Sequence, residues 1–170
     1  MSLERLWAGW RSEYVKDATA QNRSLGEHGC VFCELLSQAP GPDNGVVVRG
    51  ERAAVVLNAF PYGSGHLLIL PLRHESSLGD LDEAEATELW AMARRAVAAV
   101  ESAYGPDGVN LGANLGEAAG AGIPAHLHLH VLPRWSGDTN FMTSIAETRV
   151  LPESLSETWT RVRAAWPDAG

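Results

Sequence analysis

The stretch AHLHLHVLPRW, residues 125–135, carries three imidazoles at alternating positions: His126, His128 and His130. Uncharged imidazole is available near neutral pH, where it serves as a nucleophile, a proton carrier or a metal ligand. In an extended strand every second side chain points to the same face, about 6.6 Å from the last. The pattern therefore predicts a row of imidazoles along one face of a strand, open to a surface or a cleft.

The apolar residues between the histidines determine which face that row occupies. Burial of Leu127, Leu129 and Val131 fixes the register, because a slip of one residue would put the imidazoles in the core. Three interpretations remain: a polar surface face, a three-histidine metal site, and covalent catalysis in which one ring carries a phosphoryl or nucleotidyl group. The rarity of histidine disfavours the first. In a flat row the central ring cannot readily share a tetrahedral metal with both neighbours, so catalysis is favoured.

The chain has two cysteines, Cys30 and Cys33, in C-x2-C spacing. This spacing suits two ligands of one tetrahedral zinc ion. Reduced buried thiols and a redox dithiol are the alternatives, although no thioredoxin-like βαβ pattern surrounds the pair. A metal would need two further ligands, and His28 is a local candidate.

A glycine-rich loop, NLGEAAGAGIPAH, leads into the histidine stretch from residue 114 to 126. Glycines at 116, 120 and 122 allow backbone amides to approach an anion closely. The loop does not open a predicted helix, so it is neither a P-loop nor a dinucleotide-binding fingerprint. A plain flexible connection fits the loop about as well when it is considered alone.

Composition limits the partners. The 170 residues suit one domain with terminal extensions, and the net charge of −8 argues against a nucleic-acid or membrane-surface binder. No apolar run is long enough to span a bilayer, and the first residues lack the apolar core of a secretory signal. With two cysteines close together and no signal peptide, we expect a protein of the reducing cytoplasm. The net charge does not exclude a small anionic ligand.

The elements that must position these residues follow from periodicity and turn signals. Five strands are predicted, at 46–49, 53–58, 66–72, 109–115 and 126–133, the third buried on both faces. A long helix, capped by Asp80 or Asp82, follows the third strand and ends at GPDG, 105–108. Aromatic residues at helical spacing predict short terminal helices, marked by Trp7, Trp10 and Tyr14 and by Leu155, Trp159, Val162 and Trp166. This order indicates an α+β domain with a mainly antiparallel five-stranded sheet.

Four stretches in this order resemble the histidine triad (HIT) family of nucleotidyl transferases and hydrolases. HLHLHVL looks like the family signature, and VLNAFPYGSGHLLILPLRH, 56–74, resembles its ribose-binding strand and turn. CVFC resembles the cysteine pair of zinc-containing bacterial members. HVLPRWSGDTNFM, 130–142, resembles a bacterial branch that includes actinobacterial diadenosine tetraphosphate phosphorylases. The resemblance implies a HIT-like fold over 28–145, with an N-terminal extension at 1–27 and a C-terminal helical extension at 146–170.

The resemblance also implies roles for individual residues. His128 falls on the family's nucleophile, His130 on the histidine near the leaving group, and His126 on a supporting residue that ligates zinc in some members. Asn58 falls on the ribose-binding position, and His66 on a supporting histidine for which a purely structural role is at least as well justified. The remaining implied zinc ligands are Cys30, Cys33 and His74.

The glycine loop falls where relatives bind phosphate, with Asn114, Gly120 and Gly122 as the implied contacts. Arg134 would add local positive charge. Many relatives have a serine, threonine or glutamine shortly before the first histidine, whereas this chain has Gly122, Ile123 and Pro124. Backbone amides would have to replace that side chain.

The implied activity is nucleotidyl transfer from a dinucleoside polyphosphate, with magnesium accompanying the substrate. In a phosphorylase, phosphate accepts the adenylyl group and diadenosine tetraphosphate yields ATP and ADP. In a hydrolase, water is the acceptor; hydrolysis of nucleoside phosphoramidates is a further possibility. An interpretation of another class is a non-catalytic, zinc-stabilised nucleotide-binding module. Relatives are commonly homodimers, so we expect one here.

Overall fold

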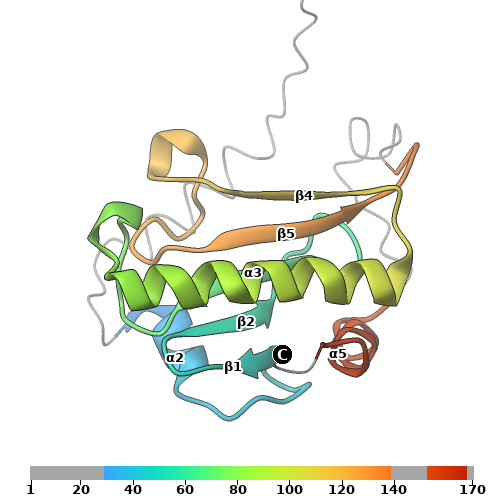
Figure 1. Ribbon diagram of the computed structural model, residues 1–170, viewed down its shortest axis with the longest axis horizontal. Coiled ribbons are helices and arrows are strands. Elements are labelled where there is room, and N and C mark those ends of the chain that lie inside the picture. Colours follow the sequence, from blue (N-terminus) through green and yellow to red (C-terminus); the bar gives the residue numbers. More distant parts are fainter. Residues whose placement is uncertain (1–28, 139–152, 168–170) are drawn as a thin grey trace, which may run out of the picture.

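The computed structural model describes residues 29–138 and 153–167 (Figure 1). The predicted N-terminal helix, His28 and residues 139–142 of the last family stretch lie outside this range. Within it, no helix has the length and apolarity that crossing a membrane requires. The helices and strands are α2 (Val31–Leu36), β1 (Val46–Arg49), β2 (Ala53–Leu57), β3 (Leu67–Pro71), α3 (Glu83–Tyr104), β4 (Gly108–Ala113), β5 (Leu129–Arg134) and α5 (Leu155–Ala164).

The five strands form one antiparallel sheet in the order β1-β2-β3-β5-β4, which confirms the predicted fold class. Because β5 is inserted between β3 and β4, it is paired on both sides. Val131 of β5 lies opposite Leu67 on one side and Leu111 on the other. The strand that carries His130, the last of the three histidines, is therefore held in the interior of the sheet.

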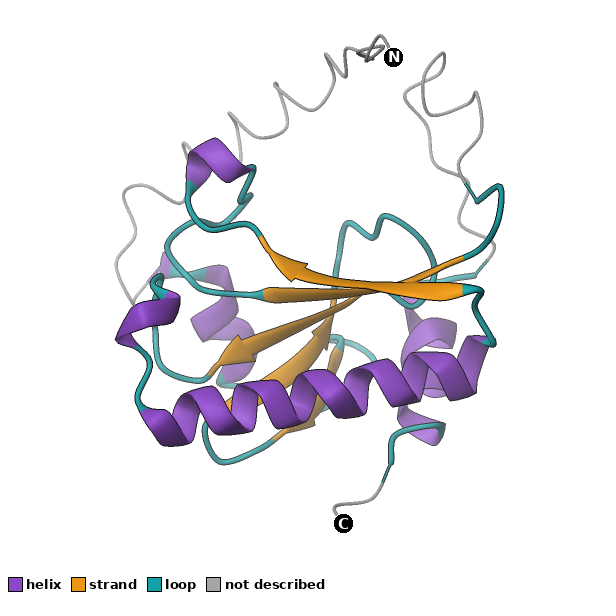
Figure 2. Ribbon diagram, turned by 45° about the horizontal axis from the view of Figure 1, so that its top comes forward, coloured by secondary structure: helices purple, strands orange, loops and turns teal. Residues whose placement is uncertain are grey.

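The sheet has a core on each face, and the alternation of side chains along β2 divides them. Val55 and Leu57 point to the face covered by α3 and α5, whereas Ala54 and Val56 point to the face covered by α2. Figure 2 shows the long helix α3 lying across one face of the sheet. All five residues of β2 and of β3 are buried, as an apolar strand between two layers requires.

Both ends of α3 have the predicted caps. The Asp82 side chain accepts a hydrogen bond from the Glu85 backbone N–H, and the Glu85 side chain accepts one from the Asp82 backbone N–H. This capping box satisfies two N–H groups that no helical carbonyl can reach. Gly105 ends the helix in the left-handed conformation, which a residue without a Cβ adopts at little cost.

Three features differ from the prediction. The ladder of β5 begins at Leu129, because the Leu127 backbone N–H donates to the Glu75 carbonyl rather than to β3, whose last residue is Pro71. In α5 it is Thr158 that is buried, whereas Leu155 at the first turn is 40% exposed. The six-residue helix α2 was not predicted; its buried residues, Phe32 and Leu36, are one helical turn apart.

Candidate active site and metal cluster

The three histidines lie on the α2 face of the sheet, and the predicted open row is in fact largely enclosed. His126 and His128 are 1% and 6% exposed, and His130 is half-buried. Phe32 of α2 packs on the first two rings, with centroid distances of 5.6 and 5.4 Å. The intervening residues Leu127, Leu129 and Val131 are in the α3-side core, as predicted. A helix absent from the prediction is what covers the imidazoles.

The backbone fixes which nitrogen of His128 carries the proton. Its Nδ1 lies 2.8 Å from the carbonyl oxygen of His126, and a carbonyl can only accept a hydrogen bond. Nδ1 therefore donates, and in the neutral ring the lone pair is on Nε2. Burial lowers the pKa of His128 and favours this neutral form.

A second chain of contacts fixes the proton on His130. The Tyr62 backbone N–H donates to His66 Nδ1 at 3.0 Å, and the Asn58 amide nitrogen lies 3.3 Å from the same atom. His66 Nδ1 is thus an acceptor, so His66 must donate through Nε2 to His130 Nδ1, 2.9 Å away. His130 is left with its proton on Nε2. Two neighbouring rings, 5.1 Å apart, are therefore held in opposite tautomers.

The turn before His66 is shaped by a close contact. Gly65 has φ +76°, and a Cβ there would lie 2.7 Å from a ring carbon of Tyr104 at the end of α3. Only glycine tolerates both the conformation and the contact. The turn residues PYGSG thus place His66 beside the start of β5, where its ring contacts His130.

The four predicted metal ligands, Cys30, Cys33, His74 and His126, come together on the same side of the sheet. All four ligand atoms lie within 4.8 Å of one another. Cys33 Sγ is 3.2 Å from His74 Nδ1, and His126 Nδ1 is 3.4 and 3.6 Å from the two sulfurs. A tetrahedral zinc with Zn–S near 2.3 Å and Zn–N near 2.0 Å has S–N edges of about 3.5 Å. The spacing fits such an ion.

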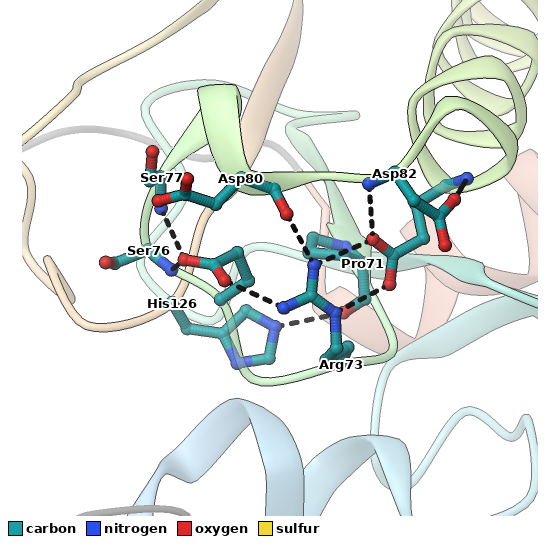
Figure 3. Close-up of polar contacts among 9 residues, drawn as sticks. Pro71, Arg73, Ser76, Ser77, Asp80, Asp82 and His126 are labelled. Atoms are coloured by element: carbon teal, nitrogen blue, oxygen red, sulfur yellow. Dashed lines mark hydrogen bonds and ion pairs between the residues drawn. The ribbon is translucent and has the colours of Figure 1, made fainter.

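The tautomer of His126 also suits a metal. Its Nε2 donates to the Pro71 carbonyl at 2.9 Å (Figure 3). The Nδ1 lone pair therefore faces the two sulfurs. A hydrogen bond from the far ring nitrogen to a carbonyl is the usual support of a ligating histidine. Burial lowers the pKa of His126 to about 4, which keeps that lone pair available at neutral pH. Cys30 and Cys33 are not joined in a disulfide.

The remaining predicted contacts are arranged less directly. The Asn58 side chain closes the turn by accepting from the Phe60 backbone N–H at 2.9 Å. In the glycine loop, Gly120 has φ +92° and its carbonyl accepts from the Asn114 amide at 3.4 Å. Gly122 has open space around the position of a Cβ.

Arg134 is already paired. Its guanidinium binds Asp138 through two hydrogen bonds of 2.6 and 2.7 Å and donates to Asn110 at 2.9 Å. Asp138 raises the pKa of Arg134 and offsets its charge. The prediction of a phosphate-binding role for Arg134 did not take this partner into account. An arginine and an aspartate four residues apart across a turn are the sequence signal from which this ion pair could have been predicted.

Comparison with known proteins agrees with this geometry. A sequence model of the HIT domain matches residues 41–137. An AP-4-A phosphorylase of Mycobacterium tuberculosis is 37% identical over 166 residues, which cover 96% of this chain and 85% of the relative. An asymmetrical bis(5'-nucleosyl)-tetraphosphatase of Schizosaccharomyces pombe is 32% identical over 93 residues, 55% of this chain and 50% of the relative. Among solved structures, a Zn-bound histidine triad family protein of Mycobacterium smegmatis aligns with a TM-score of 0.66 and 31% identity, covering 82% of this chain and 94% of that one.

Proposed function

The chain belongs to the HIT domain family, and from that premise we propose that it is a dinucleoside polyphosphate phosphorylase that works through a nucleotidyl-histidine intermediate. The carrying observation is the pair of opposite tautomers. His128 has its lone pair on Nε2, and its neighbour His130 has a proton on Nε2. One ring can attack while the other donates.

In the first half-reaction, His128 Nε2 attacks the α-phosphorus of the substrate. The new N–P bond forms as the P–O bond to the departing nucleotide breaks, and His130 Nε2–H donates to the departing oxygen. The His126 carbonyl, which accepts from His128 Nδ1, stabilises the positive charge that develops on the ring. Magnesium accompanies the polyphosphate.

In the second half-reaction, an oxygen of inorganic phosphate attacks the same phosphorus, its proton passes to His130 Nε2, and the electron pair of the N–P bond returns to His128. Diadenosine tetraphosphate then yields ATP and ADP. Water is abundant, so phosphate must be held in line to compete. We assign this role to the backbone amides of the glycine loop around Gly120 and Gly122, with Asn114 beside them. Asn58 is assigned to the ribose, and Arg134 to the outer phosphates once a substrate competes with Asp138.

The test is product analysis from diadenosine tetraphosphate at millimolar phosphate. ATP plus ADP in equal amounts supports the phosphorylase. AMP plus ATP, unchanged as phosphate is raised, would instead identify a hydrolase, the activity named for the Schizosaccharomyces pombe relative. Mass spectrometry of protein mixed with substrate adds a second criterion, because a nucleotidyl adduct separates an enzyme from a non-catalytic nucleotide-binding module.

We assign a structural zinc ion to Cys30, Cys33, His74 and His126. The edge distances and the His126 tautomer support this assignment. Four protein ligands would complete the tetrahedral coordination of the ion. The proposed role of the zinc is therefore structural: it would hold His126, at the start of the histidine segment. Elemental analysis of protein purified without chelators should give one zinc per chain. Absence of metal, with both thiols reactive in the native state, would reject the assignment. We also propose a cytoplasmic location, where cysteines stay reduced.

We assign a homodimer to the edge of the sheet that β4 forms, where no further strand pairs within the described residues. The sequence of β4, GVNLGA, carries no charge or proline that would protect an edge strand, and Leu111 is 44% exposed. An antiparallel edge can pair with its own copy about a twofold axis. Light scattering should report a dimer that Leu111→Lys dissociates. Leu155→Lys, at a similarly exposed site on α5, should leave it intact.

A further inference from the structure

Arg73 connects three parts of the molecule that meet beside the metal cluster. It follows β3 and precedes His74, and its side chain is directed toward the first turn of α3 (Figure 3). Its Nε and one terminal nitrogen bind the two carboxylate oxygens of Glu85, each at 2.8 Å. The fork geometry orients the guanidinium as well as attracting it. Glu85 is itself buried and fixed by the Asp82 backbone N–H.

The same guanidinium holds the segment that follows it. One nitrogen donates to Glu75 at 2.8 Å and another to the Asp80 carbonyl at 2.8 Å. The other oxygen of Glu75 accepts from the backbone N–H groups of Ser76 and Ser77. The loop between β3 and α3 is thus tied together around Arg73, and His74 lies inside it.

Residues 71–75, held in this way, contact the backbone that leads into β5. The Leu127 backbone N–H donates to the Glu75 carbonyl at 2.6 Å, and the His126 ring donates to the Pro71 carbonyl at 2.9 Å. The backbone pairing between β3 and β5 ends at Leu129, so these contacts hold the residues that precede it. The backbone on both sides of Leu127 therefore depends on residues 71–75, and the His126 carbonyl in turn fixes His128 Nδ1.

We propose that Arg73 is a positioning residue that links the first turn of α3 to the histidine segment and to the metal cluster. Its fork anchors it to Glu85, and its remaining terminal nitrogen binds Glu75, so that the segment containing His74 is held between them. The Glu75 carbonyl accepts from the Leu127 backbone N–H, and His74 contacts Cys33 in the cluster. The link to Leu127 stands on geometry alone, whereas the link to the cluster rests on the proposed zinc site. Loss of the fork should loosen both while leaving the α3 core folded.

Two variants test the proposal. Arg73→Ala removes the guanidinium, and Arg73→Lys keeps the charge but loses the paired hydrogen bonds. Amide exchange at Leu127 should accelerate by about 10-fold or more in both, while exchange at Ala93 and Ala96 in α3 stays as in the wild type. Zinc release to a chromophoric chelator should accelerate by about 10- to 100-fold, as for loss of a group that supports a metal ligand.

Arg161→Ala is the matched control, because Arg161 also pairs with a glutamate, Glu153, but on the C-terminal side of the molecule. It should change neither readout. Unaltered Leu127 exchange in both Arg73 variants would overturn the proposal, as would equal acceleration at Leu127 and throughout α3, which indicates only global destabilisation. Zinc-free wild-type protein would reject the proposed metal site, and Leu127 exchange would still decide whether Arg73 fixes the strand.

Discussion

The two faces of the sheet are built by different rules. The α3 face packs an apolar core beneath a 22-residue helix with a capping box and a C-terminal glycine cap. The α2 face is covered by a six-residue helix without a side-chain cap and contains the histidines and cysteines. On the first face specificity comes from side-chain volume, and on the second it comes from hydrogen bonds that choose one nitrogen of each ring. The α3 face therefore contributes mainly to stability, and the α2 face carries the residues of the candidate site.

The largest effect should come from His128 on the α2 face. His128→Gly removes the proposed nucleophile, so turnover of diadenosine tetraphosphate should fall by about 10⁴- to 10⁶-fold. Thermal unfolding should shift little, because the core on the α3 face is untouched. Steady-state kinetics and a melting curve check both parts. Normal turnover without added imidazole would contradict the assignment.

Leu89 should give the converse result. Leu89→Ala empties a fully buried site on α3 and should cost about 2 to 5 kcal/mol of unfolding free energy. Chemical denaturation measures that loss, and kcat of the folded protein should stay near that of the wild type. The neighbouring residue Trp90, 46% exposed, serves as the control: Trp90→Ala should stay within about 0.5 kcal/mol. A large fall in kcat for Leu89→Ala would show that the two faces are coupled.

His66 should have a smaller and more selective effect. His66→Ala removes the donor that keeps the proton of His130 on Nε2 and should lower kcat by about 10- to 100-fold, less than the largest contribution of a general acid. The loss should shrink with an AMP ester of p-nitrophenol, whose leaving group needs no proton. An equal loss on both substrates would argue for a structural role only. Ser64→Ala in the same turn, where the hydroxyl has no hydrogen-bond partner within the described structure, is the control.

The smallest effect concerns acid stability. The Arg73 guanidinium and the Asp82 backbone N–H lower the pKa of Glu85 to about 2. Because the folded-state pKa lies below its usual value, the stabilisation is complete above about pH 4.5 and is lost as the pH falls toward 2. Glu85→Gln should therefore flatten the dependence of unfolding free energy on pH in that window. Denaturation series between pH 2 and 6 measure the slope, and a slope equal to the wild type would contradict the prediction.

Much of the fold could be predicted, because the periodicity of apolar residues and the residues that begin or end helices and strands are local features of the sequence. The alternation of Leu127, Leu129 and Val131 predicted which side chains enter the core, and Asp82 and Gly105 mark the ends of α3. The candidate metal cluster was predicted in full, since the C-x2-C spacing and the family resemblance pointed to the four side chains that meet.

Long-range hydrogen bonds escaped prediction. No local pattern indicates that the Glu75 carbonyl would accept from the Leu127 backbone N–H and so end the β3–β5 ladder early. The same holds for His66, whose role depends on a partner 64 positions away. Phe32 was missed for another reason: a helix of six residues offers too few positions for its periodicity to stand out.

The edge of β1 carries a consequence for assembly. The Val46 carbonyl at that edge accepts from the Gly41 backbone N–H at 3.0 Å and from the Trp159 indole of α5 at 2.8 Å. A sheet with two available edges can add copies without end, as fibrils do, whereas a sheet with one can add a single copy and then close. Because α5 contacts β1 at this carbonyl, we expect the proposed self-association to use the β4 edge and to end at a pair of copies rather than a polymer.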